Sequence, residues 1–225
     1  NGKDIPFMSF WIIATYLLVS IIEKFYNDRD IDIKLIFYIS FVTAFLISIR
    51  ITGILILIQY LVALVILLNI KNINFFSFMK KNVFFFSIFS FLLIIFTYLL
   101  NPILWHNPLE LVSSVKWMGK YYHDICTLTL GSCMRALNLP SSYMFIWFFF
   151  KLPIIILFGL CLFPFVEEKI IKKDMKKVYY GIFIITPLIL LFIFILKNIA
   201  LYDEIRHIMF LIPFLFLVGL YNIFI

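Results

Sequence analysis

The stretch VFFFSIFSFLLIIFTYLL, at residues 83–100, decides the fold class of this chain. It carries no charge along its whole length, and a helix of about 20 such residues crosses the ~30 Å hydrocarbon core of a bilayer. Similar apolar stretches recur near residues 7–22, 34–49, 51–70, 144–166, 178–196 and 208–225. We therefore predict an all-α integral membrane protein, a polytopic bundle of about seven transmembrane helices.

The composition supports the same class, because 64% of the residues are hydrophobic and 20% are aromatic, against roughly 45–50% apolar residues in a soluble domain. No internal repeat or Gly/Ser-rich linker divides the chain, so we expect one transmembrane domain over residues 1–225. The chain starts at Asn1 without a cleavable signal and stops inside an apolar run at Ile225. We expect it to be the C-terminal part of a longer protein.

The basic residues predict the orientation in the membrane. Loops 23–34, 71–82 and 167–177 alternate with the other loops and hold eleven of the nineteen Lys and Arg residues, which places them in the cytoplasm by the positive-inside rule. Segments 101–143 and 197–207 are then extracytoplasmic. The net charge of +7 is explained by these loops, so we do not predict a nucleic-acid partner.

The extracytoplasmic loop 101–143 is the longest one and carries helix signals. Asn107, Pro108 and Glu110 have the order of an N-cap, a first helical proline and a capping-box acid. Apolar residues at spacings of four, three and four follow beside two lysines, which predicts an amphipathic helix on the membrane surface: Leu111, Val115, Met118 and Tyr122. Three cysteines, Cys126, Cys133 and Cys161, lack metal-ligand spacing. We expect the first two to be unpaired, with a disulfide as the less favoured alternative.

Polar residues at the extracytoplasmic membrane boundary are the candidate site. Asp4 precedes the first apolar stretch, where its carboxylate caps the helix or helps to bind a metal or a phosphate-bearing substrate. Arg206 and His207 open the last stretch. A guanidinium there holds a phosphate with two hydrogen bonds, or anchors the helix by pairing with Asp203 or Glu204.

Other candidates lie in or beside the long loop. Lys151 follows three phenylalanines, and such a lysine either snorkels to the interface or faces a polar cavity. Trp105, His106 and Tyr143 fit an interfacial aromatic belt, and an aromatic ring can also stack on a sugar.

Four stretches together resemble one family. They are Asn1–Phe7 before a span, Ile49–Gly53 between two spans, Trp105–Pro108 with Leu139–Tyr143 across the long loop, and Tyr202–His207 before the last span. In order and placement they resemble the C-terminal half of a GT-C membrane glycosyltransferase, of the protein O-mannosyltransferase and lipid A aminoarabinose transferase group.

The resemblance implies transfer of a sugar from a polyprenyl-phosphate donor to an unidentified acceptor at the extracytoplasmic face. It also implies a catalytic acid in a first outer loop, expected upstream of Asn1, and a second aspartate that maps onto Asp4. Lys3, Asp4, Lys151, Arg206 and His207 would then bind the donor phosphate, with Asp4 also a potential ligand of a divalent metal. Trp105, His106, Tyr143 and Asp203 would contact sugar or acceptor.

The competing interpretation is a non-enzymatic lipid-handling protein or transporter subunit. A transporter is expected to carry polar or ionisable groups near the middle of the membrane, and the candidates here are Lys151, Gln59 and Thr43. We favour the enzyme, in a bacterial inner membrane with membrane lipid as its surroundings.

Overall fold

The computed structural model describes residues 2–117, 126–135, 139–140, 142–170, 174–196 and 206–224, without the side chains of 167–170 and 174. The first half contains α1 (Asp4–Tyr26), α2 (Ile33–Ile49), the 3₁₀ segment η1 (Ile51–Leu55), α3 (Ile56–Lys71), α4 (Phe75–Lys81) and α5 (Val83–Leu100). The long loop holds α6 (Ile103–His106), α7 (Glu110–Trp117), β1 (Cys126–Thr129) and β2 (Ser132–Arg135). The remainder is α8 (Tyr143–Lys151), α9 (Ile154–Cys161), α10 (Phe163–Ile170), α11 (Asp174–Leu196), η3 (Arg206–Leu211) and α12 (Ile212–Phe224).

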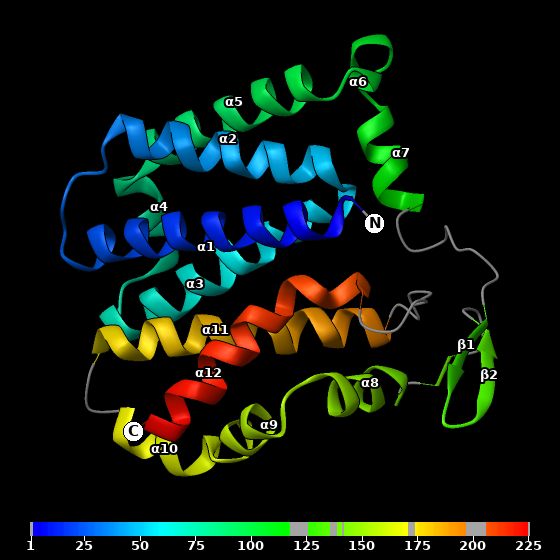
Figure 1. The fold of residues 1–225 in the computed structure, drawn as a ribbon. Helices are drawn as coiled ribbons and strands as arrows, with labels where there is room; N and C mark the ends of the chain where they lie inside the picture. Colours follow the sequence, from blue (N-terminus) through cyan, green and yellow to red (C-terminus); the bar gives the residue numbers. More distant parts are fainter. Residues whose placement is uncertain are drawn as a thin grey trace.

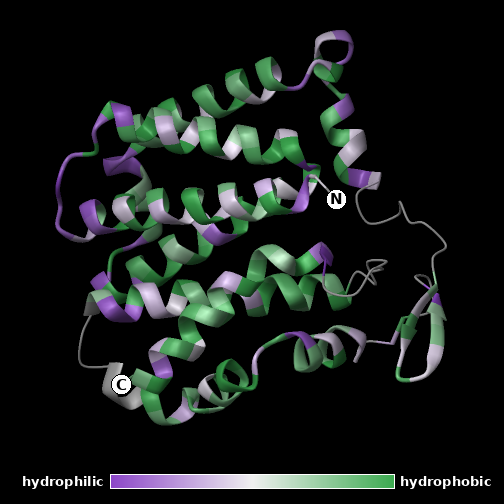
Figure 2. Cartoon of the chain, viewed as in Figure 1, coloured by the Kyte–Doolittle hydropathy of each residue, from purple (hydrophilic) through white to green (hydrophobic). Residues whose placement is uncertain are grey.

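The prediction of an integral membrane protein agrees with five helical segments that are long and apolar enough to cross a bilayer. These are α1, η1 with α3, α5, most of α11, and η3 with α12. The predicted span at 34–49 forms α2, whose 17 residues extend only about 25 Å at 1.5 Å per residue. Figure 2 shows hydrophobic residues along the helices and hydrophilic residues gathered at the helix ends.

The predicted span at 144–166 is not one straight helix. It forms α8 and α9, which are bent by 119° at Leu152 and Pro153. Proline forces the residue before it out of the helical region, and Leu152 has an extended backbone with ψ of 139°. The pair is therefore either a broken span or a re-entrant segment.

The helices lie side by side in a row in Figure 1. Contacts join α5 to α2, α2 to α1, α1 to α3, α3 to α11, α11 to α12 and α12 to α9. Helix α5 lies at the edge of this row, and Thr97 is its one buried side chain. This agrees with a helix that faces lipid on most of its surface.

Two places bring backbones unusually close. At Gly53 an added Cβ would lie 2.6 Å from the Leu46 carbonyl oxygen, so the glycine lets η1 fold back against α2. At Gly159 an added Cβ would lie 2.1 Å from the Gly219 carbonyl oxygen, where α9 crosses α12. Small residues of this kind allow close helix packing in membranes.

The row of helices has two ends, which we call the Asp4 end and the Lys71 end. The Asp4 end holds the start of α1, the end of α2, η1 and the start of η3, and the Lys71 end holds the end of α3, the loop between α1 and α2, and α4 (Figure 1). The first and last residues of successive helices thus alternate between ends, as the predicted topology requires.

The long loop differs from its prediction in two respects. Helix α7 begins at Glu110 rather than Pro108, and it covers Leu111 and Val115, whereas Met118 and Tyr122 lie outside the described residues. Strands β1 and β2 form an antiparallel hairpin, which adds a small β element to the expected all-α fold. Its turn places Leu130 and Gly131 at positive φ, of 51° and 78°.

The prediction that Cys126 and Cys133 are unpaired is wrong, and the less favoured alternative, a disulfide, is observed. Cys126 and Cys133 form a disulfide that joins the two strands, and Cys161 is a free, exposed cysteine. The strand register explains the pairing, because Cys133 lies opposite Leu128 and Cys126 opposite Arg135, which brings the two Cα atoms to 5.4 Å.

Candidate functional site

A buried carboxylate between two arginines is the main polar feature of the Asp4 end. Arg206 Nε donates to Asp4 Oδ2 at 2.6 Å, and Arg50 Nη2 forms an ion pair with Asp4 Oδ1. The Asp4 side chain is 6% exposed, and those of Arg50 and Arg206 are 22% and 25% exposed. We call these three residues the Arg–Asp–Arg cluster.

Three separate segments of the chain build this cluster. Asp4 is the first residue of α1, so it does not serve as the N-cap, which is Lys3. Arg50 lies at the break between α2 and η1, where its backbone is extended. Arg206 is the first residue of η3, which packs against α1.

Aromatic packing beneath the cluster fixes how α1 meets η3. The Phe210 ring packs edge-on against Phe7 at 5.4 Å between centroids and lies 4.3 Å from Trp11. All three rings are at most 2% exposed. Arg50 also lies over the Phe7 ring at 6.0 Å, a cation–π contact. The cluster therefore lies next to three buried, closely packed aromatic rings.

The charge of the cluster suits an anion. Two guanidinium groups face one carboxylate, so these three side chains sum to +1, and the exposed Lys3 next to Asp4 adds another positive charge. A guanidinium has five N–H donors in a planar fork, so Arg50 can donate to an anion as well as to Asp4. Both arginine side chains are partly exposed, so an anion can approach them.

A divalent metal fits this donor set poorly. Both carboxylate oxygens of Asp4 face guanidinium groups, whose positive charge opposes a second cation. Within the described residues, no group of three or more His, Cys, Asp or Glu side chains has a metal-binding arrangement. The expected metal role of Asp4 therefore gains no support from its surroundings.

The other predicted site residues are spread over the Asp4 end and the long loop. His207 follows Arg206 in η3 and is half-buried. Trp105 and His106 belong to α6, where Trp105 is 55% exposed and donates from Nε1 to the Tyr98 carbonyl. Asp203 lies outside the described residues.

Tyr143 and Lys151 lie at the two ends of α8. Tyr143 is 1% exposed and belongs to the same hydrophobic cluster as Phe7, so its ring has little surface for stacking on a sugar. Lys151 is exposed beside the bend, and its Nζ lies 5.3 Å from the centre of the Trp147 ring.

One half of the long loop approaches the cluster. Asn101 Nδ2 donates to Ser48 Oγ at 2.9 Å, close to Arg50, and α7 contacts η1. The cluster itself contains residues from three of the four stretches that resemble the glycosyltransferase group: Asp4, Arg50 and Arg206.

Arg50 is the cluster member that the sequence prediction did not name as a site residue. A signal was present, because Arg50 is the one charged residue between Lys34 and Lys71. A charge that interrupts such a long apolar segment is expensive in a membrane unless it is paired or placed at the interface. Its carboxylate partner was not evident from the sequence.

Gln59 and Thr43, two candidates for a transport pathway, bond to neighbouring helices. Gln59 is fully buried, accepts from Trp11 Nε1 at 2.9 Å, and donates to Thr15 Oγ1 at 3.1 Å. Thr43 and Tyr60 share a hydrogen bond of 2.7 Å. These groups join α1, α2 and α3, which accounts for them without a transport pathway.

Comparisons of the chain with protein-family models, with curated proteins and with solved structures give no match.

Proposed function

We propose that this chain is the membrane part of a glycosyltransferase that uses a polyprenyl-phosphate sugar, with the Arg–Asp–Arg cluster as its phosphate site. The convergence of Asp4, Arg50 and Arg206 carries the proposal, because a paired guanidinium cluster at a membrane boundary is suited to a lipid-linked phosphate. The proposal includes seven membrane segments in a bacterial inner membrane, with segments 101–143 and 197–207 extracytoplasmic.

The proposed reaction breaks the bond between the sugar C1 atom and the phosphate oxygen of the donor. The acceptor hydroxyl oxygen forms the new bond to C1, and its proton passes to an acidic residue expected in an outer segment upstream of Asn1. The electron pair of the broken bond leaves with the polyprenyl phosphate. Arg50 and Arg206 stabilise the charge that develops on this phosphate.

Asp4 has a positioning role in this scheme. Its two oxygens bind Arg50 and Arg206, which holds both guanidinium groups beside the start of α1. The exposed residues Lys3 and Trp105 lie at the same end of the bundle and are proposed to contact the donor headgroup.

Lipid binding tests the phosphate site without requiring sugar transfer. The chain is reconstituted in phosphatidylcholine nanodiscs and titrated with decaprenyl phosphate and with decaprenol, which lacks the phosphate. We expect the phosphate to bind at least about tenfold more tightly, because each charge-assisted hydrogen bond contributes about 1.5–3 kcal/mol. Arg50→Gln and Arg206→Gln should each remove most of this difference.

Lys24→Gln is the matched control, because it removes one positive charge at the opposite end of the bundle, from an exposed pair with Asp32. Equal binding of the phosphate and the alcohol by the unmodified chain would refute the phosphate site. In the full-length protein, Asp4→Asn and Arg206→Ala should abolish sugar transfer and leave membrane insertion intact. Full transfer activity in both variants would refute the enzymatic proposal.

A further inference from the structure

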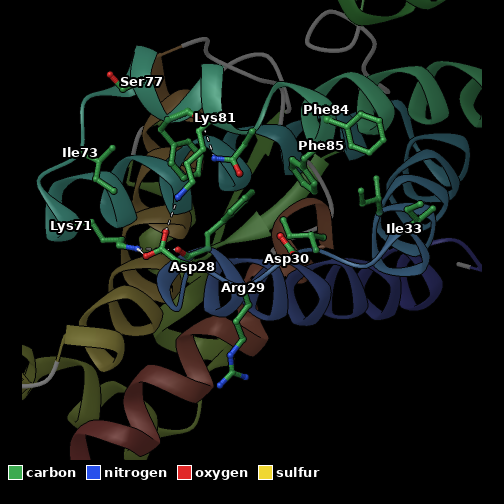
Figure 3. Close-up of a pocket in the computed structure, with 15 residues that line it drawn as sticks. Asp28, Arg29, Asp30, Ile33, Lys71, Ile73, Ser77, Lys81, Phe84 and Phe85 are labelled. Carbon is green, nitrogen blue, oxygen red and sulfur yellow. Dashed lines mark hydrogen bonds and ion pairs between the residues drawn. The ribbon is translucent and has the colours of Figure 1, made fainter.

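A cavity of about 550 Å³ lies at the Lys71 end, away from the Arg–Asp–Arg cluster. It is bounded by the end of α1, the loop that follows it, the start of α2, the end of α3, α4 and the start of α5. Phe25, Ile36 and Phe78 line it and are at most 8% exposed. Figure 3 shows charged side chains on the same cavity.

Two of these charged groups, Lys71 and Asp28, form hydrogen bonds and ion pairs within the protein. Lys71 Nζ donates to the Phe25 and Tyr26 carbonyls at 3.2 and 3.0 Å and to Asp28 Oδ2 at 2.6 Å. An ammonium has three N–H donors, so all of those on Lys71 are used. Asp28 also accepts from Lys81 at 3.1 Å, so each of its oxygens has a lysine partner.

Two other groups keep bonding capacity toward the cavity. Lys81 is 70% exposed and has one acceptor among the described residues, Asp28, so two of its three donors remain. Asp30 is exposed, and its carboxylate has no hydrogen bond or ion pair within the described part of the chain. Lys81 projects from α4 and Asp30 from the loop after α1, and Figure 3 shows both among the residues that line the cavity.

The position of the cavity favours a lipid over a soluble molecule. It lies where α3 ends at Lys71 and α5 begins at Val83, which is the boundary between apolar helix and charged loop. Phe84 lines the cavity and is 68% exposed. The apolar surface of α5 continues from Phe84 to the exposed residues Phe91 and Ile94. An acyl chain can follow this apolar surface while its headgroup occupies the cavity.

We propose that this cavity binds a phospholipid whose headgroup carries both a phosphate and a primary ammonium, as in phosphatidylethanolamine. The phosphate accepts from Lys81, and the ammonium donates to Asp30. A purely anionic headgroup would leave the Asp30 carboxylate facing negative charge, and a choline headgroup has no N–H to donate. This inference does not depend on the proposed enzymatic function.

Native mass spectrometry of the whole chain in detergent tests the proposal with three dioleoyl lipids: phosphatidylethanolamine, phosphatidylcholine and phosphatidylglycerol. For the unmodified chain we expect the first bound molecule of phosphatidylethanolamine to have about tenfold higher affinity than the first bound molecule of either other lipid. This difference corresponds to one charge-assisted hydrogen bond. Asp30→Asn should bring phosphatidylethanolamine close to phosphatidylcholine. Lys81→Gln should weaken the binding of all three lipids.

A control variant removes a similar charge from a neighbouring position. Lys80→Gln alters the residue beside Lys81 in α4, and Lys80 does not line the cavity. This variant should bind lipid as the unmodified chain does.

Equal affinity for phosphatidylethanolamine and phosphatidylcholine in the unmodified chain would overturn the proposal. Tightest binding of phosphatidylglycerol would also overturn it, by showing a site for net negative charge alone. Circular dichroism of each variant shows whether the helices are retained, and Asp30 and Lys81 are both exposed, so their substitution leaves the packed core intact.

Discussion

Replacing Asp4 with asparagine is expected to destabilise the protein strongly. The carboxylate is 6% exposed and faces two guanidinium groups that are each about a quarter exposed or less. Asparagine keeps the size and polarity of the side chain and removes only its charge. Removing one partner of a buried ion pair costs about 3–5 kcal/mol, because the opposite charge then lacks compensation. We expect a loss near the lower limit, about 3 kcal/mol, because both arginines retain some contact with solvent.

Reversible unfolding by sodium dodecyl sulfate in mixed micelles measures this change, with tryptophan fluorescence as the signal, since Trp11 is fully buried beneath the cluster. Asp32→Asn is the control with the same substitution, and its carboxylate is 72% exposed and paired with Lys24 at 2.6 Å. We expect the control to unfold at nearly the same detergent fraction as the unmodified chain, because exposed ion pairs contribute little to stability.

Arg206→Gln should cost less than Asp4→Asn, about 1–2 kcal/mol, because Asp4 then keeps its ion pair with Arg50. The order of the two losses is therefore part of the prediction. If Asp4→Asn unfolded at the same detergent fraction as Asp32→Asn, the cluster would contribute no more than a surface pair, and the argument from burial would be refuted.

Three further predictions concern other parts of the bundle. Gly159→Ala should destabilise the protein by about 1–3 kcal/mol in the same unfolding assay, because its Cβ would overlap the facing backbone, and unchanged stability would contradict this. Gln59→Leu should cost about 1–3 kcal/mol by leaving the buried Trp11 N–H without its acceptor, and a neutral effect would refute the assigned bond. Hydrogen bonding from Lys71 is the main cause that lowers the pKa of Asp28 below its ordinary value of 3.8. This ion pair therefore stabilises the fold above that value and is lost as the pH falls below it. In Lys71→Met, a carbon-13 NMR titration should show the pKa of Asp28 moving up toward 3.8.

The apolar segments were predictable because hydrophobicity and length are local properties of the sequence. All seven predicted stretches contain helix in the structure, and within the described residues hydrophilic side chains gather at the helix ends. The break at Pro153 was also a local signal, since proline excludes helix at the preceding residue. The long apolar run around it led to the prediction of a single span.

The long loop was less predictable. Its hairpin depends on a two-residue turn at Leu130 and Gly131 and on the strand register that brings Cys126 to Cys133. Leucine is an unusual residue at positive φ, so the turn lacked the Asn-Gly or Asp-Gly pattern that marks most such hairpins.

The Arg–Asp–Arg cluster was predictable only in part. Asp4 and Arg206 stood out because each lies beside an apolar segment. Their contact depends on η3 packing against α1 through Phe210, which is a long-range event that no local pattern encodes. The role of Arg50 likewise depends on the close turn at Gly53.

The long sequence separation within the cluster has a consequence for biosynthesis. Asp4 and Arg206 are 202 positions apart, whereas Arg50 belongs to the first three helices, which contact one another. As the ribosome delivers these helices to the membrane, Asp4 and Arg50 can neutralise each other long before η3 is made. Arg206 then joins a pair that already exists, so the complete cluster forms only after η3 has packed against α1.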